Sequence, residues 1–237
     1  MISLPEFQEN VKKCWHFSVA AAWDQNARHP ELPRSKCMEE RAYLHTLLGT
    51  NEIEVFKKAC LLADQAQTQA EMDVLLPELI QWMTENKYPV TLGNPAFEAG
   101  RTFRYNVLPN NWCYMHIRNA KMPESFLSDP GYVADNLRFI MDLAEKEHQC
   151  DTLYTATWLN DYPPFLRFFP EEWQKNLADT GDFGPTMGWQ GQFINRRGLL
   201  NESAAAKFLE TGVLPCARRE SHCSFEALRQ HLNKLSF

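Results

Sequence analysis

The stretch WCYMHIRN, residues 112–119, and the stretch DTLYTATWLN, residues 151–160, decide the fold predicted for this chain. Both are rich in β-branched and aromatic residues, which favour strands. Between them, residues 131–148 place apolar side chains at helical spacing. We therefore expect a strand, a helix and a second strand at the centre of the protein.

The first of these strands should have two unlike faces, because side chains alternate in direction along a strand. One face should belong to the core and carries Cys113, Met115 and Ile117. The other should carry an aromatic, titratable and cationic row, made of Trp112, Tyr114, His116 and Arg118. Such a row fits the lining of a pocket, and it also fits the solvated face of an amphipathic strand.

The rest of the chain falls into two parts. Residues 1–87 read as helices, and the composition changes at Tyr88-Pro89. Residues 88–237 alternate strands with helices. In that part we expect a hairpin of strands at 102–107 and 112–117, a strand at 187–194, and helices over 131–148, 201–212 and 224–235. The prediction is an α+β protein in which an N-terminal helical part packs on a C-terminal mixed or antiparallel sheet, as one compact unit.

Composition is typical of a globular protein. The 237 residues are 44% hydrophobic and 23% charged, and the net charge is −6. Lys and Arg form only short pairs, which argues against a nucleic-acid partner. No apolar run approaches the roughly 18–20 residues that cross a bilayer, so no membrane partner is expected. The segment MISLPEF, residues 1–7, lacks the basic and apolar regions of a signal peptide, so we expect a cytoplasmic protein.

The seven cysteines include no CxxC pair. Scattered cysteines of this kind are typical of reduced, buried thiols. The histidines form no metal-ligand spacing with cysteine or acidic residues, and no metal site is predicted.

His116 is the strongest candidate for acid–base catalysis, because histidine titrates near neutral pH. A lone histidine in a strand is also often a structural hydrogen-bonding group. Asp161, just after the 151–160 strand, is the candidate catalytic partner. The residues expected to bind substrate lie on the aromatic face, at strand ends, in the GWQGQ segment, and in the NRRG turn, where two arginines suit an anion. They are Tyr114, Arg118, Asn119, Trp158, Asn160, Trp189, Gln190 and Arg196.

From about residue 102 to 194, the order hairpin, loop, helix, strand, short helix, strand resembles the middle and end of a GNAT-type acyltransferase domain. In that family, a loop and the following helix hold the pyrophosphate of acyl-CoA. The resemblance implies acyl-CoA as cofactor, with Asn160 positioning substrate or cofactor. The family's loop signature, Gln/Arg-x-x-Gly-x-Gly/Ala, is absent from residues 118–131, where Met122–Phe126 stands. Short segments such as residues 169–173 are also similar to those of uncharacterised bacterial proteins.

Three functions follow as hypotheses. The first is acyl-CoA-dependent acyl transfer to a small molecule, with His116 as general base and Arg118 holding an anionic group. The second is a cofactor-independent lyase, isomerase or cyclase that uses an aromatic pocket, with His116 and Asp161 as acid and base. The third is a non-enzymatic module that binds a ligand or a protein.

Overall fold

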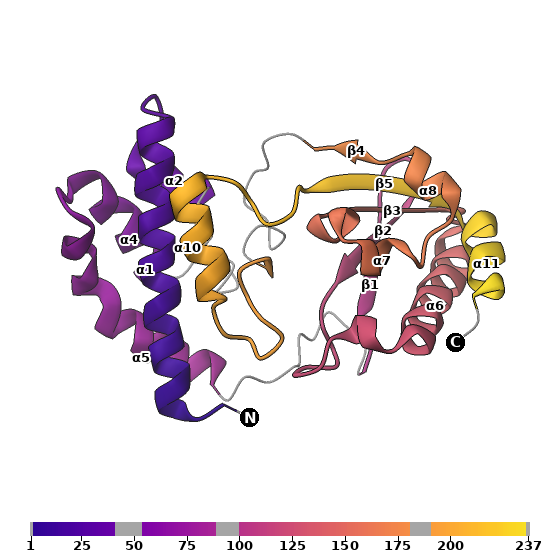
Figure 1. Ribbon diagram of the computed structural model, residues 1–237, viewed down its shortest axis with the longest axis horizontal. Coiled ribbons are helices and arrows are strands. Elements are labelled where there is room, and N and C mark those ends of the chain that lie inside the picture. The colour runs from indigo at the N-terminus through magenta and orange to yellow at the C-terminus, as the bar shows by residue number, and fades with distance from the viewer. Residues whose placement is uncertain (1, 41–53, 89–99, 181–190, 236–237) are drawn as a thin grey trace. The chain divides into compact units, whose positions relative to one another are not determined.

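The computed structural model describes residues 2–40, 54–88, 100–180 and 191–235 (Figure 1). The chain divides into two compact units. The first contains residues 1–91 and 183–215, and the second contains residues 92–182 and 216–237. The change in composition noted at Tyr88-Pro89 lies close to the position where the chain first passes from the first unit to the second. Residues 183–215, which we expected in the second part, belong to the first unit.

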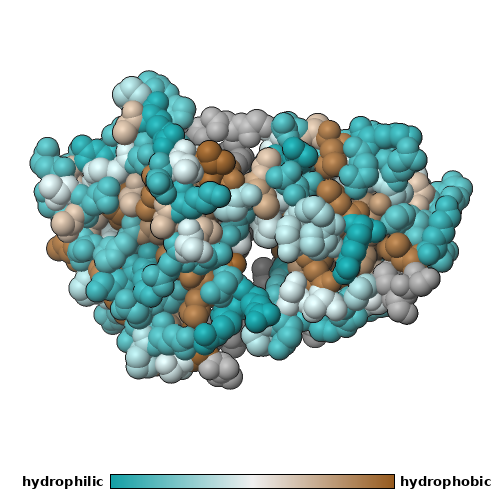
Figure 2. Space-filling view, viewed as in Figure 1, coloured by the Kyte–Doolittle hydropathy of each residue, from teal (hydrophilic) through white to brown (hydrophobic). Residues whose placement is uncertain are grey.

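The first unit is helical. Its described elements are α1 (Leu4–Arg28), α2 (Arg34–Glu40), α4 (Glu54–Gln65), η1 (Gln69–Leu75), α5 (Leu76–Lys87) and α10 (Glu202–Thr211). Ser3 caps α1 by accepting a hydrogen bond from the amide of Glu6, and Pro5 lies in the first turn. Trp15, Met38 and Met72 are fully buried between the helices. Figure 2 shows hydrophilic side chains over most of the visible face of this unit, as amphipathic helices require.

Pro77 marks the boundary between two helical elements of the first unit. The 3-10 helix η1 ends at Leu75, and α5 begins at Leu76 with the proline in its first turn. Proline lacks an amide hydrogen and is tolerated in the first turn of a helix, so its position there is consistent with the boundary.

A separate aromatic cluster joins α1 to the later part of this unit. The ring of Phe17 lies 4.8 Å from Phe193 and 6.2 Å from Phe208, measured between ring centroids. All three rings are buried. Residues from both stretches of the chain therefore share one core.

The second unit contains a five-stranded mixed sheet in the order β1-β2-β3-β5-β4. The strands are β1 (Phe103–Val107), β2 (Cys113–Ile117), β3 (Thr152–Thr157), β4 (Ala178–Asp179) and β5 (Arg219–Ser224). β1 and β2 form the expected antiparallel hairpin. β2 and β3 are parallel neighbours, and β5 pairs antiparallel with both β3 and β4. The predicted α+β class is confirmed, with helices preceding one mixed sheet.

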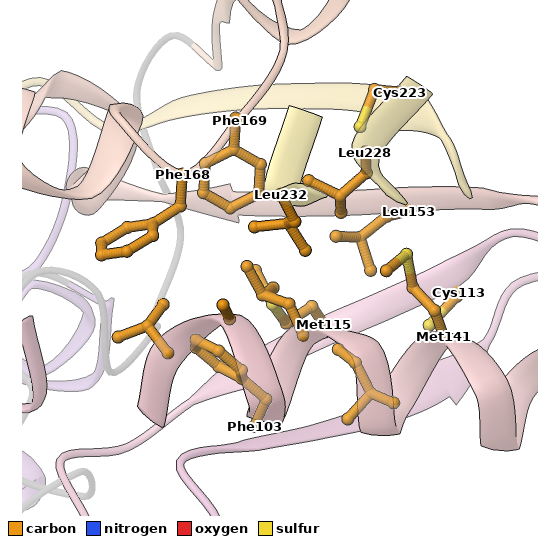
Figure 3. Packing of buried hydrophobic residues seen from close by; sticks show 14 of the residues in the cluster. Phe103, Cys113, Met115, Met141, Leu153, Phe168, Phe169, Cys223, Leu228 and Leu232 are labelled. Carbon is orange, nitrogen blue, oxygen red and sulfur yellow. The ribbon is translucent and has the colours of Figure 1, made fainter. Parts of the chain in front are cut away.

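Helix α6 (Pro130–His148) connects the two parallel strands. Asp129 caps it by accepting from the amide of Tyr132, and Gln149 ends it in the left-handed region at φ 57°. The predicted apolar stripe of Leu137, Ile140, Met141 and Ala144 is buried, as expected. Figure 3 shows the side chains that meet over this face of the sheet, among them Phe103, Cys113, Met115, Leu153 and Met141.

Helix α11 (Phe225–Lys234) lies beside α6 in Figure 1. Arg229 on α11 forms ion pairs with Asp142 and Glu145 on α6, with N–O distances of 2.9 and 2.6 Å. Leu228 and Leu232 complete the core between these helices and the sheet (Figure 3). Among the described helices, none combines the length and the apolar character that a membrane crossing requires.

The predicted strand at 151–160 is shorter than expected. It ends at Thr157, and Trp158–Asp161 forms the 3-10 helix η3. Thr157 caps this turn by accepting a hydrogen bond from the amide of Leu159, which ends the extended conformation. Three further short helices belong to this unit, namely η2 (Phe126–Ser128), α7 (Pro163–Leu166) and α8 (Glu171–Lys175).

The predicted strand at 187–194 is wrong over its described residues. Residue 191 is helical, residues 192–193 form a turn, and Ile194 makes only an isolated bridge with Leu200. The sheet instead obtains its remaining strands from β4 and β5. The sequence of β5, RESHCS, is polar and lacks β-branched residues. Its pairing with β3, rather than local propensity, makes it a strand.

Candidate functional site

The sheet of the second unit has the two unlike faces that the alternation predicts. Cys113 and Met115 lie in the core with α6, and Ile117 packs against that core. The opposite face carries aromatic and imidazole rings from β2, β3 and β5. We call it the aromatic face and define it by Trp112, Tyr114, His116, Tyr154 and His222.

The rings of the aromatic face form a connected row. Tyr114 lies 4.6 Å from His116 and 5.2 Å from Tyr154. Trp112 stacks on His222 at 4.7 Å and lies 6.0 Å from Tyr154. All five side chains are half-buried. Contacts of this kind orient each ring through its neighbour and leave part of each ring accessible.

His116 is held as a neutral imidazole. Its Nε2 atom is buried and has no hydrogen-bond partner among the described residues. Burial, together with the guanidinium of Arg104 directly opposite on β1, lowers the pKa of His116 from 6.5 to about 4. At neutral pH this ring therefore carries no charge, and it has one nitrogen that can donate a hydrogen bond and one that can accept.

Tyr154 is bound to a carboxylate. Its hydroxyl donates to Oε2 of Glu220 across 2.8 Å. Burial, then this hydrogen bond and the charge of Glu220, raise the pKa of Tyr154 well above its ordinary value of 10, although the nearby Arg218 opposes the shift. Tyr154 therefore stays protonated. The Nε atom of Arg218 is itself buried and without a hydrogen-bond partner in the part of the chain that the structure describes.

The parallel strands β2 and β3 pair at only two positions, Cys113 with Leu153 and Tyr114 with Tyr154. At the next position, Thr155 donates its side-chain hydroxyl to the carbonyl of Met115 across 2.8 Å. A side chain thus replaces the main-chain ladder where the strands begin to separate. Tyr114 and Tyr154 of the aromatic face form the last pair before the strands separate.

Three of the predicted residues lie on η3 after β3. Asn160 is fully buried, and its side chain donates to the carbonyls of Thr155 and Arg219 and accepts from the indole of Trp173, at 3.1, 2.9 and 3.2 Å. It therefore holds η3 and α8 to the sheet. Trp158 is half-buried and packs against the core.

Asp161 is engaged by main chain and by an arginine. It accepts a hydrogen bond from the amide of Ala217 at 2.9 Å and pairs with Arg219 at 3.3 Å. Arg219 also pairs with Asp179 on β4. The carboxylate of Asp161 thus fastens the chain before β5.

Arg118 and Asn119 follow β2. The Nε of Arg118 donates to the carbonyl of Arg101 at 2.9 Å, which ties the chain after β2 to the residues before β1. Asn119 donates to the carbonyl of Glu124 and accepts from the amide of Lys121, so it shapes the loop before η2. Neither interaction points to a ligand by itself.

The remaining predicted residues are not among those that form the aromatic face of the second unit. Trp189 and Gln190 lie outside the described residues. Arg196 belongs to the first unit and is exposed in a turn, where its neighbour Arg197 pairs with Glu6 at 2.8 Å. The structure instead adds Tyr154, Glu220 and His222. The alternation of side chains along β3 predicts which face of the sheet Tyr154 occupies. Glu220 and His222 could not be found in this way, because the sequence of β5 gives no strand signal.

The described residues do not form a metal centre, and the start of α6 does not form a phosphate site. No group of three or more His, Cys, Asp and Glu side chains there has the arrangement of a metal site. At the start of α6, the first-turn amide of Tyr132 is bound by the carboxylate of Asp129, which Lys121 also engages. The added negative charge disfavours an anion, so these residues do not fit the diphosphate of a nucleotide.

A second feature of this unit is a shallow open groove of about 460 Å³ between β1 and α6. Its walls are the five residues of β1 and, on α6, Phe139, Ile140, Leu143, Glu147 and His148. None of the rings of the aromatic face lines it.

No protein-family model matches the chain, and no curated protein or solved structure matches it either.

Proposed function

We propose that the sheet-bearing unit is a cofactor-independent acid–base enzyme, a lyase, isomerase or cyclase, acting on a small carboxylate on the aromatic face. The observation that carries the proposal is the half-buried, neutral His116, whose buried Nε2 lacks a partner among the described residues and lies in a row of half-buried rings. Buried polar atoms are normally satisfied, and those that are not cluster at functional sites.

The roles follow from the charges. His116 accepts a proton from carbon or oxygen of the substrate, because its imidazole is neutral at pH 7. Tyr154 stays protonated, and it turns its one hydroxyl hydrogen from Glu220 to the developing oxyanion, to which it donates a hydrogen bond or a proton. The Nε of Arg218, which has no hydrogen-bond partner among the described residues, suits the carboxylate of the substrate. Tyr154 takes the place of Asp161 in the predicted acid–base pair, because Asp161 is engaged by Ala217 and Arg219.

The test is solvent exchange. A panel of aromatic and α,β-unsaturated carboxylates is incubated with the protein in deuterated water, and deuterium incorporation is followed by NMR. Wild type should label at least one compound, and His116→Gln should slow that labelling by about 10²–10⁴-fold with the fold intact. The exposed His16, in the first unit, gives the control His16→Gln, which should label at the wild-type rate. Equal rates for His116→Gln and wild type contradict the proposal.

A second candidate is acyl transfer from a thioester, in a GNAT-like build. It is favoured by the antiparallel β1–β2 hairpin, the α6 crossover to the parallel β3, and the early separation of β2 from β3. Separating strands offer main-chain groups to an extended chain that bears amides, as the pantetheine arm of acyl-CoA does. The start of α6, however, does not fit the diphosphate, so the nucleotide is not assigned to that helix.

Thermal-shift titration separates the two candidates. Acetyl-CoA, free CoA and D-pantetheine are added to the full chain up to millimolar concentration. Acyl transfer predicts a saturable rise in Tm, because a ligand that binds only the folded state stabilises it by mass action. A rise in Tm with D-pantetheine, which lacks the nucleotide, is the result expected if the separated strands bind the pantetheine arm. An unchanged Tm with all three eliminates acyl transfer and leaves the acid–base proposal standing.

A further inference from the structure

The groove between β1 and α6 lies along a sheet edge to which no other described strand is paired. β1 is the terminal strand of the sheet, and among the described residues it pairs only with β2. The main-chain bonds that flank this pairing join Arg118 to Thr102 and Leu108 to Trp112. In an antiparallel pair these bonds recur at every second residue. The amides and carbonyls of Phe103, Tyr105 and Val107 therefore point outward to the edge.

Helix α6 forms the other wall of the groove. Phe139, Leu143 and Glu147 are spaced four residues apart, so they form one row on the helix, and they line the groove with β1. Phe139 and Leu143 are only half-buried. Phe139 and Leu143 thus lie where the side chains of one more strand would pack. The same strand would form hydrogen bonds with the outward-facing main-chain groups of β1. Unprotected edges of this kind invite strand pairing.

The edge is complementary to itself. When two β1 strands run antiparallel with Tyr105 opposite Tyr105, Phe103 of one copy lies opposite Val107 of the other, and Arg104 lies opposite Asn106. All six outward-facing main-chain groups of each copy then find partners. A two-fold axis requires this kind of self-complementary surface.

The charges at the two ends of the groove agree with this register. Arg101 precedes β1, pairs with Asp135 across 2.5 Å and lies over the ring of Phe139, 4.1 Å from its centroid. At the other end, Glu147 accepts a hydrogen bond from the hydroxyl of Tyr105 at 3.2 Å. Antiparallel pairing brings Arg101 of each copy toward the end where Glu147 of the other lies, so opposite charges meet.

From these observations we infer that the β1 edge pairs with the β1 edge of a second copy of this chain, so that the two sheets become one. The side chains of Tyr105 and Val107 of each copy then lie beside the row on α6 of the other, whereas Phe103 stays in the core of its own copy.

Sedimentation velocity of the full chain, over about 1–100 µM, tests the inference. Wild type should show a concentration-dependent monomer–dimer equilibrium. Val107→Pro should remain monomeric throughout, because it removes an outward-facing amide that makes no bond within the chain, and proline is tolerated at such edge positions. Val107→Thr keeps the amide and should dimerise as wild type does. Circular dichroism establishes that each variant is folded.

Charge exchange tests the register. Glu147→Arg and Arg101→Glu should each weaken dimerisation by about tenfold or more, and the double variant should restore it. A wild type that stays monomeric at the highest concentration overturns the inference, and it then points to an extended segment of another protein as the occupant. A dimer that tolerates Val107→Pro, or a double variant no tighter than the single ones, also overturns it.

Discussion

Thr155 donates its hydroxyl to the main-chain carbonyl of Met115 across 2.8 Å, at the position where β2 and β3 cease to pair. Both residues are buried. The side chain supplies a donor that the parallel ladder no longer provides, so the strands separate without leaving this carbonyl unsatisfied. The separation of the strands is therefore encoded by a particular residue.

Replacing Thr155 with Val should destabilise the sheet by about 1–2 kcal/mol, because the carbonyl of Met115 then stays buried without a donor. Thr155→Ser keeps the hydroxyl and should cost less. Hydrogen exchange of the β2 and β3 amides measures the difference locally. Equal protection in the wild type and in Thr155→Val contradicts this role.

Asn160 should behave as a structural residue. Asn160→Ala leaves the indole of Trp173 and the carbonyls of Thr155 and Arg219 without their partner, at a cost of about 2–4 kcal/mol. Urea denaturation measures the loss. A variant with unchanged stability but impaired binding of a ligand would return Asn160 to the binding role that the sequence suggests.

The stability of the protein should depend on pH through His116. Its pKa is about 4 when folded and near 6.5 when unfolded, so the unfolded chain binds the extra proton between these values. Stability is therefore full above about pH 6.5 and falls as the pH drops toward 4, by up to about 3 kcal/mol.

His116→Gln should flatten the slope between pH 6.5 and 4, and His148→Gln, at an exposed position, should retain it. Denaturation at several pH values measures the slope. An NMR titration of the His116 ring with a midpoint near 6.5 would contradict the assignment.

The cysteines should differ sharply in reactivity. Cys14, Cys37, Cys113, Cys150 and Cys223 are buried. Burial raises the pKa of Cys14 to about 12, which suppresses the reactive thiolate. Near neutral pH, iodoacetamide should label the half-buried Cys216 first in the folded protein, and the half-buried Cys60 more slowly, because burial raises the pKa of Cys60 to about 12 as well. In urea it should label all seven. Peptide mass spectrometry identifies the sites. Rapid labelling of Cys113 in the folded protein would contradict the core described for the sheet.

Much of the fold follows from local pattern. The hairpin, the helix from Pro130 and the core face of Cys113 and Met115 are predictable, because their periodicities agree with their burial. β5 is not, since its polar sequence becomes a strand only through pairing with β3. The end of β3 was also missed, because the hydroxyl of Thr157 competes with the strand preference of the residues after it.

The residues of the candidate site also fall into two groups, those that local pattern predicts and those that it does not. Tyr114 and His116 share one strand, so their common face follows from alternation. Glu220 and His222 reach that face from a strand far along the chain, and no local signal links them to it. Asn160 and Asp161 were expected to face a ligand at a strand end. The 3-10 turn that they occupy directs their side chains to other parts of the unit instead.

The chain passes from the helical unit to the sheet and back before either is complete. Lys13 pairs with Glu202, 189 positions later, and Phe17 meets Phe208 in the same helical core. During synthesis, α1 therefore leaves the ribosome long before its partners exist. The sheet likewise waits for β5, which is made after α10. Neither unit can therefore close before these later segments are made, so the helical unit waits for α10 and the sheet waits for β5.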